Sequence, residues 1–303
     1  LFYVGNTLLS VHENKVVANY IELRNIVDNK SDDGLLATSN AYFGDNRPFQ
    51  SEYGCQHPNS AVQYNGYVYF LDASKGIVCR TDNNGVNTIS DIKMRSFFRQ
   101  ICSEDVTDAL GVFDPYYREY VVTIKTPNQE KTVSWNEDKN RWVTFYSFIP
   151  ERYASVLRSI VSFVDGKFYL HDLGNTYNNF YGTQYRTELT CIPHTDNTKQ
   201  TFHTVLLQGV QADPLTNDWA IESITNDFQQ QSRLKKQHFR LKENFWCASF
   251  LRDLTDTTVS NPIINGRNLR GQELVCKFVN DSTDLVSLQQ IVTTIVLSER
   301  TPK

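Results

Sequence analysis

The segment "KTVSWNEDKNRWVTFYSF", residues 131–148, decides the fold class of this chain. Polar residues 136–141 separate two stretches in which apolar and polar residues alternate, which is the pattern of two half-buried strands joined by a turn. The segment therefore predicts a β-hairpin.

The two tryptophans of this hairpin predict its register. Trp135 and Trp142 lie at equal distances from the turn, and large aromatic cross-strand pairs stabilise one alignment over its neighbours. The adjacent pairs expected in this register are Val133 with Thr144 and Ser134 with Val143.

Two similar segments flank the hairpin at a wide interval. "YNGYVYFLD", residues 64–72, and "FVDGKFYLHD", residues 163–172, each combine a Gly turn, an aromatic strand and a terminal Asp. The dipeptides Asn-Gly at 65–66 and Asp-Gly at 165–166 favour two-residue hairpin turns, because both central residues of such turns need positive φ.

A third strand start, in "GVFDPYYREYVVTIKT" (residues 111–126), lies midway between them. Starts near 66, 116 and 166 give an interval of about fifty residues, which is typical of propeller blades of four strands. Within the first of these units, the turn "TDNNG" (81–85) separates the predicted strands 77–80 and 86–90.

We therefore predict an all-β chain, with partial β-propeller-like blades followed by a β-sandwich-like C-terminal domain. Residues 1–50 supply strands that complete a blade or link to upstream chain, residues 51–182 form the blades, and residues 183–303 form the C-terminal β domain. Two short helices are predicted at 91–101 and 151–160. Because residue 1 is Leu, we expect a piece of a longer protein.

The composition agrees with a sheet-rich chain that does not bind nucleic acid nonspecifically. Phe, Tyr and Trp number 18, 16 and 4 against one Met, and aromatic residues favour strands. The net charge is −4, so there is no general positive field for phosphates. No run of eighteen apolar residues and no signal-peptide pattern appears.

Several carboxylates are candidates for a glycosidase pair, because two carboxyl groups that flank a glycosidic bond can catalyse its hydrolysis. Turn capping is the alternative for most of them, and the Asp/Asn clusters 28–33, 81–84 and 136–140 lack the spacing of a calcium loop. The available side chains are Asp72, Glu104, Asp105, Asp114, Glu119 and Asp172.

Histidines and cysteines show no spacing that indicates a nucleophile pair or a zinc site. We expect free thiols at all six cysteines, although their even number leaves disulfides open. We predict no catalytic, cofactor-binding or metal-ligating residue. The residues considered were His57, His171, His194 and His203, and Cys55, Cys79, Cys102, Cys191, Cys247 and Cys276.

One basic stretch, "RLKKQHFRLK" (residues 233–242), interleaves five cationic residues with apolar ones. It could bind phosphates, but cationic residues also protect the edges of sheets from unwanted pairing or meet an acidic subunit. We predict a sheet edge or an interface. The cationic residues are Arg233, Lys235, Lys236, Arg240 and Lys242.

Taken together, several segments resemble the tail proteins of short-tailed phages, most closely the muzzle or nozzle proteins of crAss-like phages. They are "YGCQHPNSAVQYNGYVYFLD" (53–72), "GIVCRTDNNGVNTISD" (76–91), "WNEDKNRWVTFYSF" (135–148), "GKFYLHDLGNTYNNFYG" (166–182), "FRLKENFWCASFLRD" (239–253) and "INGRNLRGQELVCKFVN" (264–280). The resemblance implies scaffold roles for Gly66, Trp135, Trp142, Gly166 and Gly271.

The resemblance also implies a function. It indicates a non-enzymatic virion protein, one subunit of a homo-oligomeric ring of six copies. This ring is expected to close the distal tail and to let the genome pass without specific DNA binding. Its expected partners are other tail proteins and the host surface, and assembly is expected in the host cytoplasm. The alternative is a carbohydrate-binding or glycoside-hydrolase-type propeller, which requires two carboxylates in one pocket.

Overall fold

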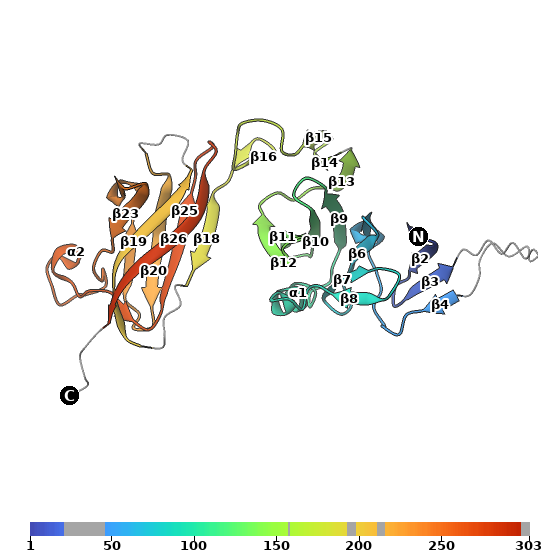
Figure 1. The fold of residues 1–303 in the computed structure, drawn as a ribbon, viewed down its shortest axis with the longest axis horizontal. Helices are drawn as coiled ribbons and strands as arrows, with labels where there is room; N and C mark the ends of the chain where they lie inside the picture. Colours follow the sequence, from blue (N-terminus) through green and yellow to red (C-terminus); the bar gives the residue numbers. More distant parts are fainter. Residues whose placement is uncertain (21–45, 157, 193–197, 211–215, 298–303) are drawn as a thin grey trace, which may run out of the picture. The chain divides into compact units, whose positions relative to one another are not determined.

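The computed structural model describes residues 1–20, 46–156, 158–192, 198–210 and 216–297. These residues form mainly antiparallel strands with little helix, which confirms the all-β prediction (Figure 1). Packing divides the chain into two compact units, Leu1–Leu173 and Gly174–Lys303. The expected start of the C-terminal domain at 183 lies nine residues beyond the start of the second unit.

Unit 1 begins with two antiparallel sheets of four strands each, in which consecutive strands are neighbours. The first sheet contains β1 (Phe2–Val4), β2 (Thr7–Val11), β3 (Val16–Tyr20) and β4 (Asn46–Pro48). The second follows a 3₁₀ turn, η1 (Pro58–Ser60), and contains β5 (Val62–Tyr64), β6 (Tyr67–Asp72), β7 (Ile77–Thr81) and β8 (Val86–Thr88).

Two further sheets complete unit 1 after helix α1 (Arg95–Ile101), which occupies part of the predicted helix 91–101. The third sheet contains β9 (Asp108–Asp114), β10 (Glu119–Lys125), β11 (Glu130–Asn136) and β12 (Arg141–Tyr146). The fourth has three strands, β13 (Arg152–Val156), β14 (Ser159–Val164) and β15 (Lys167–Leu170).

The sheets of unit 1 follow one another at a similar interval along the chain. The second, third and fourth begin at Val62, Asp108 and Arg152, close to the predicted interval, and the first strands β5, β9 and β13 contact one another in turn. The described residues do not close a propeller. The segments 64–72 and 163–172, which indicated the repeat, do not occupy equivalent positions in their sheets. β6 is the second strand of its sheet, whereas β15 is the third of its own.

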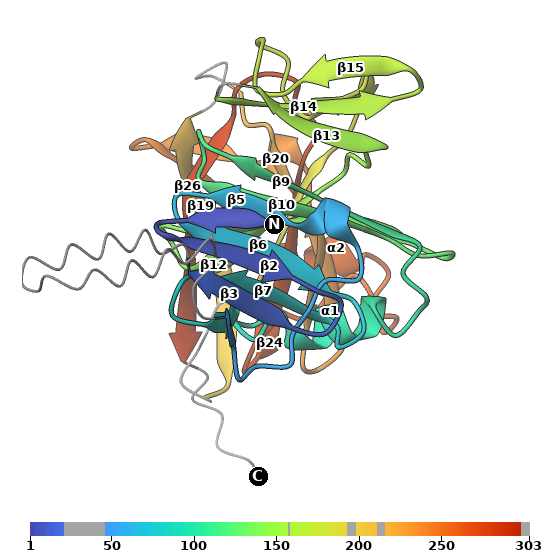
Figure 2. The same cartoon turned by 90° about the vertical axis from the view of Figure 1, so that its right-hand side faces the viewer.

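Successive sheets pack face to face. On β6, Val68 and Phe70 join the cluster shared with the first sheet, whereas Tyr69 and Leu71 join the cluster shared with the third sheet and α1. Burial on both faces explains why this strand is almost continuously apolar. The sheet β13–β15 lies at one end of the array, at the top of Figure 2.

The predicted turns have the expected backbone. Asn65 and Gly66 adopt φ of 47° and 83°, and Asp165 and Gly166 adopt 51° and 70°. Both dipeptides therefore form turns with positive φ at each central residue.

Two local predictions were wrong. Trp135 does pair with Trp142, but a β-bulge beside this pair aligns Ser134 with Thr144, so Val143 does not pair with Ser134 as predicted. In the predicted helix 151–160, residues 152–156 and 159–160 form strands, because β13 and β14 gain a full antiparallel ladder with each other.

Unit 2 contains a two-sheet sandwich with short peripheral elements. One sheet has the order β18 (Thr187–Cys191), β25 (Leu274–Asn280), β20 (Trp219–Asn226) and β21 (Gln231–Leu234). The other contains β22 (Arg240–Lys242), β23 (Phe245–Ser249), β19 (Gln200–Val210), β24 (Arg270–Gly271) and β26 (Ser287–Leu297). The peripheral elements are β16 (Asn179–Phe180), β17 (Thr183–Gln184), η2 (Lys236–His238) and α2 (Pro262–Asn265).

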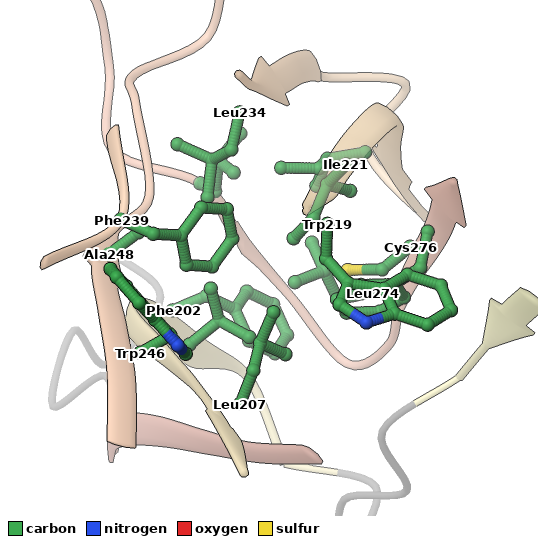
Figure 3. Close-up of a cluster of buried hydrophobic side chains, with 14 residues drawn as sticks. Phe202, Leu207, Trp219, Ile221, Leu234, Phe239, Trp246, Ala248, Leu274 and Cys276 are labelled. Atoms are coloured by element: carbon green, nitrogen blue, oxygen red, sulfur yellow. The ribbon is translucent and has the colours of Figure 1, made fainter. Parts of the chain in front are cut away.

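The core of unit 2 lies between its two sheets. Figure 3 shows Phe202 and Trp246 of one sheet opposite Trp219 and Leu274 of the other, all of them buried. Aromatic rings of this size fill the space between packed sheets. Within the described ranges, no helix combines the length and apolar character needed to cross a membrane.

Candidate functional site

The carboxylates that could have formed a catalytic pair mostly hold turns. Asp72 is fully buried and accepts hydrogen bonds from Gly54 N at 3.0 Å, Ser74 Oγ at 2.6 Å and Lys75 N at 3.1 Å. These hydrogen bonds offset the free-energy cost of burying the carboxylate. The Asp72 carboxylate therefore organises the loop after β6.

Glu104 and Asp105 also lie outside any acid pair. The Glu104 carboxylate accepts hydrogen bonds from Thr126 Oγ1, Asn128 Nδ2 and Gln129 Nε2, and these bonds lower its pKa, with Thr126 contributing most. It thus fastens the turn between β10 and β11. Asp105 is exposed to solvent.

Three other carboxylates do approach one another at the contact between the third and fourth sheets. Asp114 and Glu119 are buried cross-strand partners on β9 and β10, and Asp172 follows β15. The pKa of Asp172 is raised first by desolvation and then by the charges of Asp114 and Glu119. The sequence showed each residue but not this approach, since the three come from different strands.

The first two of these carboxylates are held by the scaffold. Asp114 Oδ1 accepts hydrogen bonds from the backbone N–H of Tyr116 and Tyr117 at 2.8 and 3.2 Å. Glu119 accepts from Asn136 Nδ2 and Tyr146 OH, both at 3.3 Å. Burial, followed by the nearby carboxylates, raises the pKa of the Tyr146 phenol well above its usual value.

Unit 1 has two surface hollows whose linings bear on the glycosidase alternative. The larger, about 610 Å³, is lined by Lys75, Arg99 and a single carboxylate, Glu52. The smaller, about 230 Å³, lies beside the first strands of three sheets and is lined by no carboxylate. Neither hollow brings two carboxylates together, so this geometry does not favour the glycoside-hydrolase alternative.

The histidines show no pairing with a thiolate among the described residues. Cys55 Sγ lies 3.1 Å from the backbone oxygen of His57, not from its imidazole. His171 Nε2 lies 2.7 Å from Ser162 Oγ, and burial lowers the pKa of His171 to about 4. His203 is exposed, and His194 lies outside the described residues.

All six cysteines are free, as expected. Burial raises the pKa of Cys102 and of Cys276 to about 12, so neither carries a reactive thiolate near neutral pH. Cys276 is the cross-strand partner of Cys191, whose pKa is also raised by burial. The Cys/His nucleophile interpretation gains no support from these environments.

The basic stretch occupies two sheet edges, in agreement with the prediction of an edge. β21 ends one sheet and contains Arg233, and β22 ends the other and contains Arg240 and Lys242. Between them, Lys236 Nζ forms an ion pair with Asp281. Cationic residues at such edges oppose pairing with foreign strands.

One face of the sheet β13–β15 exposes several large apolar side chains to solvent. We name it the terminal face. The strand register places on this side the apolar residues Ala154, Val156, Val161, Phe163, Phe168 and Leu170, together with Arg152 and Ser159.

The opposite side of the same sheet packs on the third sheet. Tyr153 OH lies 2.8 Å from Thr123 Oγ1 of β10, and Ile160 is buried. On the terminal face, by contrast, Phe168 is 75% exposed and Val156 is 51% exposed. Apolar side chains clustered on one exposed face are typical of an interaction surface.

One face of the first sheet carries no member of the hydrophobic clusters found among the described residues, and we name it the first face. Its members are Tyr3, Leu8, Ser10, Val17 and Asn19, on the side opposite the cluster shared with the second sheet. Tyr3 is 57% exposed. Sequence reasoning predicted strands in both end sheets but took the segment of β13 for a helix. It did not indicate these faces, because each strand pattern is compatible with one or two covered faces.

Comparison with known families bears directly on this arrangement. Residues 29–166 match the family described as crassvirus muzzle protein, and residues 175–253 match the family described as crassvirus muzzle protein C-terminal domain. The chain belongs to the crassvirus muzzle protein family. The two matches cover more than two thirds of its length, and membership supports a structural role in a phage tail. No curated protein matches the chain.

Family membership gives the scaffold residues a context. Gly271, one of the positions implied by the resemblance, lies against the Asp227 side chain, since a Cβ would lie 2.0 Å from Asp227 Oδ1. That oxygen accepts a hydrogen bond from Gln272 N at 3.0 Å. A side chain at position 271 would therefore displace the Asp227 carboxylate and break its hydrogen bond to Gln272 N.

Proposed function

We propose that the chain is a non-enzymatic subunit of a ring at the distal end of a phage tail, which closes the tail channel and permits genome passage. The observation that carries this proposal is the match to crassvirus muzzle proteins in both units. An array of antiparallel sheets packed on one another suits a wall built from repeated copies.

The proposed partners are further copies of the chain, six in the simplest ring, and other tail proteins. DNA is proposed to pass without specific binding. The net charge of −4 supports this, because an acidic surface does not retain phosphates. Contact with the host surface is part of the same proposal.

The proposed location is the virion tail, after assembly in the host cytoplasm. Immunogold electron microscopy of purified particles, with antibodies against this chain, tests the location. Labels at the tail end distal to the capsid are the expected result. Labels on the capsid, or particles that contain none of this chain, would contradict the proposed function.

A further inference from the structure

Cys191 and Cys276 are two cysteines of unit 2 that the fold places directly opposite one another. β18 and β25 are antiparallel neighbours, and their register pairs Cys191 with Cys276. Directly opposite residues of an antiparallel pair have Cα atoms about 4.5–5.5 Å apart and side chains on the same face of the sheet. A disulfide bond joins residues whose Cα atoms are about 4.4–6.8 Å apart, so this pair meets the distance requirement.

The two thiols share one environment. Cys276 is buried in the core of unit 2 (Figure 3), and Cys191 packs against the same hydrophobic cluster while remaining partly exposed. The pKa of Cys276 is raised to about 12 by burial and, to a smaller extent, by the charge of Cys191. Both side chains thus lie on the core side of their sheet.

No other two cysteines have this relationship in the strands that the structure describes. The cross-strand partners of Cys79 and of Cys247 are not cysteines, and Cys55 and Cys102 lie outside the strands. The arrangement is therefore particular to one pair of thiols.

We propose that Cys191 and Cys276 form a disulfide bond when the chain meets a small-molecule disulfide such as oxidised glutathione. This site is independent of the proposed ring function. The bond ties β18, an edge strand with one neighbour, to β25 in the interior of the sheet. It also closes a loop of chain that contains β19 to β24, which is most of the sandwich.

The exchange begins at Cys191, because its thiol is the more exposed of the two. Its thiolate attacks one sulfur of oxidised glutathione, the sulfur–sulfur bond of glutathione breaks, and one glutathione leaves as a thiolate. The Cys276 thiolate then attacks Cys191 Sγ, and the second glutathione leaves. The two protein thiols lose two electrons and two protons in total, which convert oxidised glutathione into two reduced molecules.

The raised pKa of both thiols determines how this bond forms and how long it lasts. Only a small fraction of either thiol is ionised near neutral pH, so the bond forms slowly. A thiol of high pKa is also a poor leaving group, so reducing thiols attack the finished bond slowly. The pair therefore acts as a structural bond and not as a rapid switch.

The test incubates the whole chain with oxidised glutathione at mildly alkaline pH, blocks the remaining thiols with N-ethylmaleimide, and maps the peptides by mass spectrometry. The wild type should give a linked pair of peptides that contain Cys191 and Cys276, with a joint mass lower by two hydrogen atoms. Cys247, which is half-buried like Cys191 but has no cysteine partner, should form at most a glutathione adduct.

Two variants separate the steps of the exchange. Cys276→Ala should stop at the intermediate, with glutathione attached to Cys191. Cys191→Ser should leave Cys276 unmodified, because Cys276 is buried. Cys247→Ala is the matched control and should form the linked pair as the wild type does. If Cys276→Ala is unfolded under reducing conditions, Cys276→Val takes its place, with the same expected adduct on Cys191.

Unit 2 should gain stability once the bond has formed. Joining two residues so far apart in the sequence restricts the unfolded chain, so oxidation should raise the midpoint of thermal unfolding by about 5–10 °C. The gain should disappear after reduction with a phosphine, and it should be absent from Cys191→Ser and Cys276→Ala.

A wild-type chain in which Cys191 stays a thiol or stops at the glutathione adduct overturns the proposed bond. Linkage of Cys276 to a different cysteine also overturns it. A bond that forms but leaves the unfolding midpoint unchanged overturns its structural role. The proposed ring function is tested by the labelling of virions, so none of these results bears on it.

Discussion

Trp135 and Trp142 are cross-strand partners whose ring centroids lie 5.5 Å apart at an interplanar angle of 64°. Trp135 Nε1 donates to Glu137 Oε2 at 3.0 Å, and Trp142 Nε1 donates to Ile89 O at 3.0 Å. The second bond connects the third sheet to the end of the second. The pair thus aligns one hairpin and joins two sheets.

Trp135→Ala should destabilise unit 1 by about 3–5 kcal/mol, because it would leave a large cavity in a fully buried site. Urea unfolding followed by far-ultraviolet circular dichroism measures the change. Tyr116→Ala, at an exposed position, should change stability by less than about 0.5 kcal/mol. Equal effects of the two substitutions would refute the proposed role of Trp135.

Unit 1 should lose stability as the pH falls from about 6.5 to about 4. The pKa of His171 is about 4 in the folded chain because of burial, whereas an unfolded histidine titrates near 6.5. In this window the unfolded state binds a proton that the folded state does not, so acid favours unfolding by on the order of 3 kcal/mol.

The difference between variants isolates this contribution. His171→Gln should flatten the pH dependence of unfolding between these two pH values, and His203→Gln, at an exposed position, should leave it unchanged. Denaturant titrations at several pH values provide the measurement. An unchanged slope in His171→Gln would exclude burial of a neutral imidazole.

Asp172→Asn should raise stability at neutral pH. The folded pKa of Asp172 is raised by desolvation and by Asp114 and Glu119, so its protonated form stabilises the fold at low pH and that stabilisation is lost as the pH rises. Solvent exposure of the Asp172 side chain keeps the gain small.

Asp165→Asn is the matched control for this substitution. Asp165 and Asp172 both adopt positive φ, at 51° and 59°, where Asn is favoured. Backbone preference therefore contributes to both variants, and only Asp172→Asn should show a gain that shrinks toward pH 3. The same gain at all pH values would point to the backbone alone.

The chain should show no saturable binding to duplex DNA at low salt. Its cationic edge residues are few, and one of them, Lys236, is paired with Asp281. Fluorescence anisotropy with a labelled duplex provides the measurement. Binding that falls steeply with salt and disappears in an Arg240→Glu, Lys242→Glu variant, but not in Lys131→Glu, Lys139→Glu, would restore the nucleic-acid interpretation of this stretch.

Local chemistry accounts for the part of the structure that the sequence determined by itself. The turns at 65–66 and 165–166 follow from the φ preferences of Asn, Asp and Gly, and the pairing of Trp135 with Trp142 follows from a short loop between alternating strands. Such features depend on residues only a few positions apart, and so does the abundance of strand over helix.

Contacts between distant segments decided the rest. The bulge beside Trp135, the strand at 152–156 in place of a helix, and the approach of Asp172 to Asp114 and Glu119 all depend on neighbours that only the folded chain supplies. The open terminal face is the same kind of feature. An alternating strand predicts that one side is apolar, but whether a sheet covers that side is determined by how the sheets stack.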